Sequence, residues 1–183
     1  MHNAHFDGSF AGWREVARAL LQQGVPPHQV NWLGDGDQGG LFDRAPDAIN
    51  TQPQAPAPRI PRQLLELLQS AARFRVEDRW SLLYRILWRV AQGDRAAMLP
   101  GDIDGSQLHK RLKAVRREAH HLHAFLRFHP RPDNAQGPQL VAWHEPAHDI
   151  LPSASEHFAE RLGRSTWLIA TPDDGVYWDS QRL

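Results

Sequence analysis

Apolar residues recur with a helical period in the stretch from 106 to 128. Five of them follow one another at intervals of three or four: Leu108, Leu112, Val115, Ala119 and Leu122. This spacing predicts one long amphipathic helix that runs into a strand. About 100° around the same helix, basic or protonatable side chains repeat with the same spacing: His109, Lys113, Arg116, His120 and His123. The pattern therefore predicts a buried face and a basic face on one helix.

The remaining hydrophobic patterns predict a mixed fold. Further helices are expected at 10–23, 62–74, 77–91 and, from an S-x-x-E capping box at Ser153 and Glu156, up to residue 162. Strands are expected at 2–6, 30–33, 124–129, 139–145, 166–170 and 176–178. The later strands form neighbouring pairs, which favours antiparallel pairing. We expect an α+β fold in which a small antiparallel sheet is covered by three or four helices.

Glycine and proline interrupt the pattern between residues 34 and 61. Such a composition is typical of a linker or a long surface loop. The sequence therefore predicts three parts: an N-terminal αβ segment at 1–33, a Pro/Gly-rich linker at 34–61 and a main α+β domain at 62–183.

Composition narrows the classes of protein. The 183 residues include no cysteine, which excludes disulfides and thiolate metal sites within them. No run of about eighteen apolar residues is present, so no membrane-spanning helix is expected. A cytoplasmic protein fits both observations. There is no G-x-S-x-G, no P-loop and no G-x-G-x-x-G motif after a strand, so serine-nucleophile, NTPase and dinucleotide chemistry have no support, and whether the chain is an enzyme stays open.

The net charge is zero, but basic residues concentrate in the middle of the chain. Residues 107–131 contain seven basic side chains and one acidic side chain. Such a segment is either a solvated helix face or a surface that contacts nucleic-acid phosphates. The candidate phosphate contacts are Lys110, Lys113, Arg116, Arg117, Arg127 and Arg131. Trp178, beside Asp179, is the candidate for stacking on a base.

Histidine and glutamate residues offer a second hypothesis. His120 and His123 share a helix face, and Glu145 and His148 follow a predicted strand. Imidazole and carboxylate groups of this kind bind divalent metals, and a metal would support hydrolysis of a phosphodiester or N-glycosidic bond. The alternative is that His120 bonds to Glu145 or Asp149 and pins the helix to the sheet. Apart from such a metal, we expect no cofactor.

Several ordered motifs resemble those of a known family. They are Asp7-Gly8-Ser9-Phe10, Tyr84-Arg85-Ile86-Leu87-Trp88-Arg89, Val115-Arg116-Arg117-Glu118-Ala119-His120, Ala124-Phe125, Arg127-Phe128, Trp143, Glu145-Pro146, His148, Trp167, Thr171-Pro172-Asp173 and Trp178-Asp179. The chain resembles a bacterial family of unknown function described as a probable DNA metabolism protein. Its members stand beside a radical-SAM protein or form the N-terminal half of a fusion to a uracil-DNA glycosylase-like domain.

The resemblance implies an accessory role in DNA repair or metabolism. We expect a DNA-binding or partner-docking domain that works with a uracil-DNA glycosylase-like or radical-SAM partner, and no membrane association. The alternatives are a metal-dependent hydrolase acting on damaged DNA and a protein–protein adaptor that does not contact nucleic acid. The chain departs from the family pattern at His121-Leu122, where Lys-Met is usual, at His144, where an aromatic residue is usual, and at Asp149, where a second histidine is common.

Overall fold

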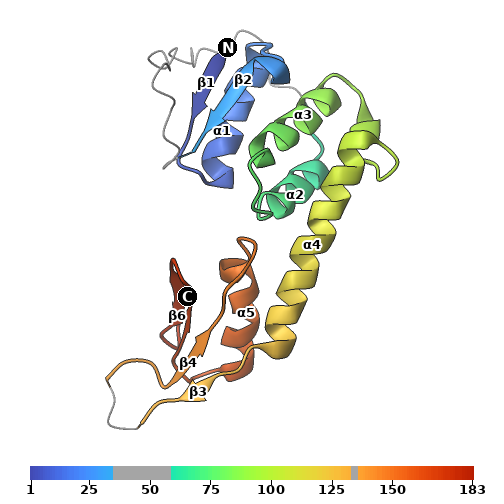
Figure 1. Ribbon diagram of the computed structural model, residues 1–183. Coiled ribbons are helices and arrows are strands. Elements are labelled where there is room, and N and C mark those ends of the chain that lie inside the picture. The colour runs from blue at the N-terminus through green and yellow to red at the C-terminus, as the bar shows by residue number, and fades with distance from the viewer. Residues whose placement is uncertain (35–58, 133–135) are drawn as a thin grey trace. The chain divides into compact units, whose positions relative to one another are not determined.

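The structure, a computed structural model, describes residues 1–34, 59–132 and 136–183 (Figure 1). The chain forms two compact units. Unit 1 comprises Met1–Ala72 and Val76–Leu112, and unit 2 comprises Arg73–Arg75 and Lys113–Leu183. The division falls within a single helix, α4 (Ile103–Phe125), which gives residues 103–112 to unit 1 and residues 113–125 to unit 2.

Unit 1 begins with a parallel strand pair, β1 (His2–His5) and β2 (Val30–Leu33), in which His2 lies opposite Val30. Parallel strands need a crossover connection, and α1 (Phe10–Gln22) lies within it, followed by the short 3-10 helix η1 (Pro27–Gln29). After the undescribed residues come α2 (Arg62–Ala71), α3 (Arg79–Ala91) and the 3-10 helix η2 (Arg95–Met98). Their apolar faces meet α1 in one core, which includes Trp13, Leu20, Leu64, Leu68 and Leu82.

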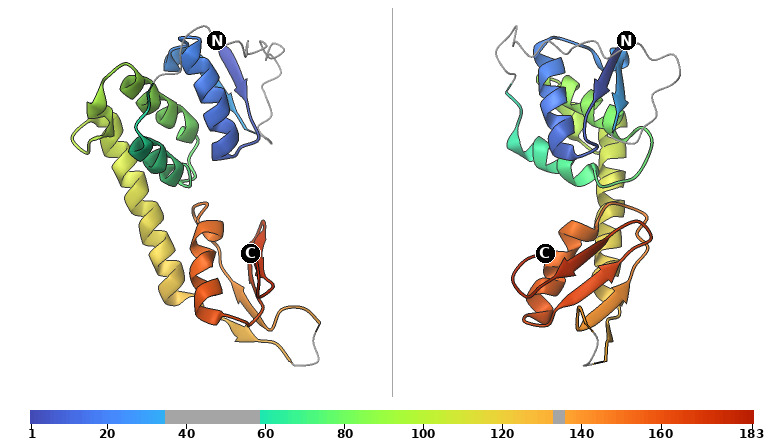
Figure 2. Two further views of the ribbon diagram at one scale, coloured as in Figure 1. Left: turned by 180° about the vertical axis from the view of Figure 1, so that it is seen from behind. Right: turned by 90° about the vertical axis from the view of Figure 1, so that its left-hand side faces the viewer.

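Unit 2 contains a four-stranded sheet in the order β3-β4-β5-β6. The strands are β3 (His129–Pro130), β4 (Leu140–Trp143), β5 (Trp167–Ala170) and β6 (Gly175–Trp178), and α5 (Leu151–Leu162) connects β4 to β5. Figure 2 shows α5 running along one face of this sheet. The core joins side chains from α4, α5 and the sheet: Val115, Leu122, Ala142, Ile150, Leu151, Ala154, Phe158, Trp167 and Ile169.

The α+β class is confirmed, but the pairing of the strands is not uniformly antiparallel. β3 with β4 and β5 with β6 are antiparallel, whereas β4 pairs with β5 in parallel, with Leu140 opposite Trp167. The reason is the connection, because α5 supplies the crossover that a parallel pair requires. In unit 1, β1 and β2 are parallel for the same reason.

Predicted element boundaries differ from the observed ones, most clearly at α4 and α5. The helix α4 continues to Phe125, so the strand expected at 124–129 is reduced to His129–Pro130. The capping box expected at Ser153 is absent, because α5 already begins at Leu151. The Ser153 hydroxyl instead donates to the carbonyl oxygen of Ile150 at 3.0 Å, and Pro152 occupies the first turn, where a missing N–H is harmless.

The compact units differ from the division expected from the sequence. Most of the predicted linker, residues 35–58, lies outside the described residues. In the structure Leu64 and Leu68 of α2 share one core with Trp13 and Ala17 of α1, and all four lie in unit 1. None of the helices in the described ranges is long and apolar enough to cross a membrane.

Candidate nucleic-acid interface

The helix α4 begins with a capped and crowded turn. The Asp102 carboxylate accepts hydrogen bonds from the backbone N–H groups of Asp104 at 2.9 Å and Gly105 at 3.1 Å, which satisfies two donors at the helix N-terminus. A side chain at position 105 would collide with the Leu99 carbonyl oxygen, so glycine is required there. This local structure fixes where the long helix starts.

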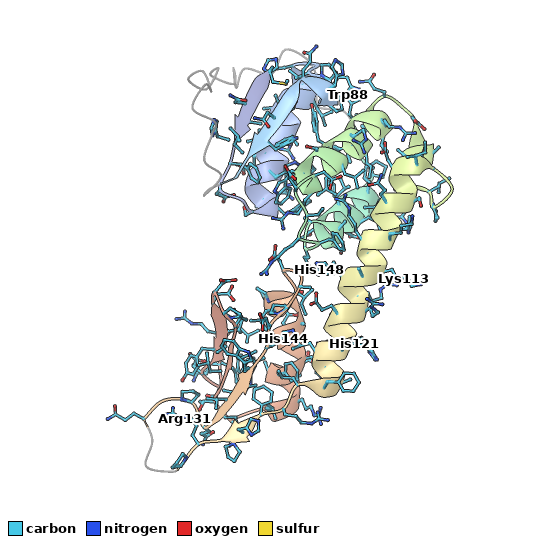
Figure 3. The ribbon with its side chains drawn as sticks, viewed as in Figure 1. Trp88, Lys113, His121, Arg131, His144 and His148 are labelled. Carbon is cyan, nitrogen blue, oxygen red and sulfur yellow. The ribbon has the colours of Figure 1, made fainter. Side chains whose placement is uncertain are left out.

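Within unit 2, the sequence period decides which side of α4 is buried. Val115 and Leu122 are 5% and 2% exposed and belong to the core. On the opposite side lie five exposed cationic or protonatable residues, which we call the basic face: Lys113, Arg116, Arg117, His120 and His121. In Figure 3, Lys113 and His121 lie on the side of α4 that points away from α5. Hydrophobic burial therefore orients the cations toward solvent.

Within the described residues, no acidic side chain forms an ion pair with a lysine or arginine of the basic face. Among the residues that the structure describes, Lys113, Arg116 and Arg117 form no ion pair, although ion pairs fix Arg62, Arg75, Arg85, Arg89 and Arg111. Lys113 and Arg117 are four residues apart, and Arg116 lies between them on the same exposed side. Like charges so close repel one another, so this arrangement suits an external anion.

The other predicted phosphate contacts are placed differently. Lys110 is exposed but belongs to the part of α4 that lies in unit 1. Arg127 is exposed and donates to the carbonyl oxygens of Ala124 and Leu126, each at 3.2 Å. Arg131 is half-buried and donates to the Gln136 carbonyl oxygen at 2.7 Å. Of the six predicted residues, three therefore form one continuous exposed group within unit 2.

The four predicted metal ligands have separate surroundings. The Nε2 atom of His123 lies 2.9 Å from the Ala154 carbonyl oxygen, and its ring stacks on His157. His148 accepts a hydrogen bond at Nδ1 from the Arg75 backbone N–H, 3.4 Å away, while His120 and Glu145 are exposed. In the described parts of the chain, no three histidine, aspartate or glutamate side chains are grouped so that they could hold a metal.

Glu118 is a site residue that the sequence analysis missed. Its Oε1 atom accepts a hydrogen bond from the Ala147 backbone N–H at 2.6 Å, which links α4 to the segment that follows β4. That link had been expected of His120. Asp149, the other expected partner, forms an ion pair with Arg75. The available signal was that Glu118 is the one acidic residue in the basic segment 107–131.

Glu118 also lies in the electrostatic environment of His144. Burial lowers the pKa of His144, and the charge of Glu118 raises it in part. The Oε2 atom of Glu118 and the Nε2 atom of His144 are buried, and neither has a hydrogen-bond partner among the described residues. Burial thus favours a neutral imidazole beside this carboxylate.

The predicted stacking residue, Trp178, is half-buried and packs against the unit 2 core. Its indole N–H donates to the Gly163 carbonyl oxygen at 3.0 Å. The ring therefore lies on the helix side of the sheet. More exposed aromatic rings in this unit are Phe125 at 68%, Trp143 at 62% and Tyr177 at 46%.

Comparison with models of protein families shows a match. The family model described as a domain of unknown function (DUF4130) matches residues 77–182, which extend from just before α3 to just beyond β6. Neither the curated proteins nor the solved structures contain a match to this chain.

Proposed function

Because the chain belongs to the domain-of-unknown-function family DUF4130, which specifies no activity, we propose a function from the charge and exposure of unit 2. The basic face of α4 binds the phosphate backbone of nucleic acid. The protein acts in this proposal as an accessory DNA-binding domain in bacterial DNA repair or metabolism, in the cytoplasm.

The observation that carries the proposal is the exposed trio Lys113, Arg116 and Arg117, none of which is ion-paired within the described residues. Arginine guanidinium groups present planar donors that match phosphate oxygens, and lysine adds a compact positive charge. Cations that neutralise phosphates release condensed counterions, which drives binding without sequence preference. The basic face therefore supports backbone contact rather than recognition of a base sequence.

The partner in this proposal is a uracil-DNA glycosylase-like domain or a radical-SAM protein. The motifs that resemble the probable DNA metabolism family support this part. A binding domain fits that setting because it would hold the nucleic acid while a partner performs the chemistry.

Charge reversal with a matched control tests the proposal. The variant R116E/R117E changes two exposed arginines of the basic face to glutamate. The control R161E/R164E makes the same change at two exposed arginines in and just after the last turn of α5. Fluorescence anisotropy with a labelled DNA duplex should show at least tenfold weaker binding for R116E/R117E and little change for the control, with circular dichroism unchanged in both.

Two outcomes would overturn the proposal. Equal losses in the two variants would mean that net charge, rather than the basic face, governs binding. Unchanged binding in R116E/R117E would remove α4 as the contact surface. If R116E/R117E still bound a uracil-DNA glycosylase-like partner at high salt and the wild-type protein bound no DNA, the adaptor function would replace the present proposal.

A further inference from the structure

One row of side chains on α4 ends in an exposed aromatic ring. Lys113, Arg117, His121 and Phe125 are spaced by four residues, which places them along one ridge of the helix. All four are exposed, and Phe125 is 68% exposed. The rings of His121 and Phe125 meet edge to face, with centroids 5.7 Å apart. The next apolar residue in sequence, Leu126, does not share this exposure, since it is half-buried and packs against the unit 2 core.

Phe125 places a large apolar ring in solvent within a row of cations. Burying a phenylalanine side chain stabilises a protein relative to leaving it exposed to water. Every other residue of this ridge is a cation or an imidazole. A large apolar ring in such a row is suited to a ligand that has both an apolar surface and negative charge.

We propose that Phe125 is a stacking platform for an unpaired base of the nucleic acid held by the basic face. This inference rests on the proposed function and specifies its substrate class: single-stranded nucleic acid, or a duplex with an unpaired base beside it. Aromatic side chains next to cations bind single strands because every base presents a flat π-face while the backbone meets the positive charges.

The dimensions of the helix fit such a ligand. Arg117 and Phe125 are eight positions apart, which corresponds to about 12 Å along the helix axis. That distance is about three to four base steps along one strand of a duplex. A nucleic acid that places a phosphate at Arg117 can therefore place a base at Phe125 within a few nucleotides.

A protein partner is the competing occupant of this ridge. An apolar surface of a partner would leave Lys113 and Arg117 without acceptors, whereas a nucleic acid satisfies the ring and the cations together. Charge complementarity therefore favours nucleic acid.

Substitution at Phe125 tests the inference. With a labelled oligothymidylate strand, F125A should bind about tenfold more weakly, because stacking on one aromatic ring is worth about 1–3 kcal/mol per base. Binding to a duplex of the same length should change less than twofold. F125W should retain single-strand binding, and F125L, which keeps apolar bulk but loses the π-face, should resemble F125A.

A second exposed aromatic residue provides the control. Trp143, on β4, is 62% exposed, and W143A removes a similar apolar area from unit 2 outside the basic face. W143A should bind oligothymidylate as the wild-type protein does. A loss in W143A with none in F125A would place stacking on the sheet and overturn the inference.

The remaining outcomes separate this inference from the proposed function. Unchanged binding in F125A together with a loss in R116E/R117E would remove the stacking platform and leave backbone binding intact. No loss in either variant would remove both. Full binding by F125L would show that apolar contact rather than stacking acts there, and would also overturn the inference.

Discussion

Arg89 of unit 1 and the arginines on α4 in unit 2, Arg116 and Arg117, have the same chemistry but opposite surroundings. Arg89 donates to Asp94, Asp102 and Asp104 at distances of 2.7–2.9 Å. In unit 2, Arg116 and Arg117 are exposed and form no ion pair in the described part of the chain. Arg89 is bound within the fold, whereas Arg116 and Arg117 are available to an external partner.

The comparison shows that the number of basic residues in a segment of sequence does not give the positive charge exposed on the surface. The basic segment 107–131 includes Arg111, which is 7% exposed and donates to both carboxylate oxygens of Asp78 at 2.7 and 3.0 Å. Its charge is already balanced. The charge available to a ligand must therefore be counted from the basic side chains that have no acidic partner in the folded structure.

Removing Arg89 from its ion pairs should have the largest effect on stability. Arg89→Met removes donors from Asp104, a carboxylate that is only 6% exposed. Because a buried charged group that loses hydrogen bonds is costly, we expect the free energy of unfolding to fall by about 2 kcal/mol. Urea denaturation followed by circular dichroism measures this change. The control Arg95→Met removes an exposed arginine and should stay within about 0.5 kcal/mol of wild type; equal losses would contradict the structural role of Arg89.

Neutralising Arg116 and Arg117 should weaken DNA binding and leave the stability of the fold unchanged. For the double variant R116M/R117M we expect a change in unfolding free energy within about 0.5 kcal/mol, because neither side chain has an ion-pair partner among the described residues. The slope of log binding constant against log salt concentration should decrease in magnitude by about two, one for each lost phosphate contact. Anisotropy titrations over a salt series measure the slope, and an unchanged slope would count against phosphate contact at these positions.

Acidification should distinguish the two units by the pH at which each weakens. In unit 2 burial lowers the pKa of His144 below its ordinary 6.5. At a pH between the folded pKa of His144 and 6.5, the unfolded state binds more protons than the folded state. The stability contributed by the neutral, buried imidazole is therefore lost as pH falls from about 6.5 through the folded pKa. The variant His144→Phe should reduce proton uptake on unfolding by up to one proton, measured as the pH dependence of urea midpoints.

The corresponding effect in unit 1 begins at lower pH. Burial alone would raise the pKa of Asp104, but hydrogen bonds and charges from Arg85 and Arg89 outweigh it and lower this pKa from its ordinary 3.8. Stability from this carboxylate is therefore present above about 3.8 and is lost as pH falls through its folded pKa. A pH dependence between 7 and 5 that His144→Phe leaves unchanged would contradict the assignment to unit 2.

The smallest effect should come from an exposed pair in unit 1. Arg62 and Glu66 form an i,i+4 pair on α2 at 2.9 Å, with side chains that are 92% and 61% exposed. Water screens such a pair, so Glu66→Gln should lower the unfolding free energy by no more than about 0.5 kcal/mol. A loss as large as that of Arg89→Met would show that burial does not separate the two kinds of pair.

Sequence periodicity predicted which α4 residues are buried, but not what they pack against. Leu108 belongs to the core of unit 1, whereas Val115 and Leu122 belong to the core of unit 2. The spacing of three and four residues is the same on both sides of the division. Periodicity reports the face of a helix and carries no information about its neighbours.

The candidate site was predictable to the extent that it lies on one helix. The positions of Lys113, Arg116 and Arg117 on an exposed face followed from local spacing. The burial of Arg111 did not, because its partner Asp78 lies 33 residues away in the chain. The contact of Glu118 with Ala147, 29 residues apart, was missed for the same reason.

The three residues Arg73–Arg75 make unit 2 discontinuous along the chain. The Arg73 carbonyl oxygen accepts from the Asp149 N–H at 2.8 Å, Phe74 lies against the His148 ring, and Arg75 pairs with Asp149 across 74 positions of sequence. Closing so long a loop costs chain entropy before any contact stabilises it. On the ribosome, these residues emerge well before their partners. We therefore expect this short segment to dock late in folding, after the strands and helices of unit 2 have formed around local contacts.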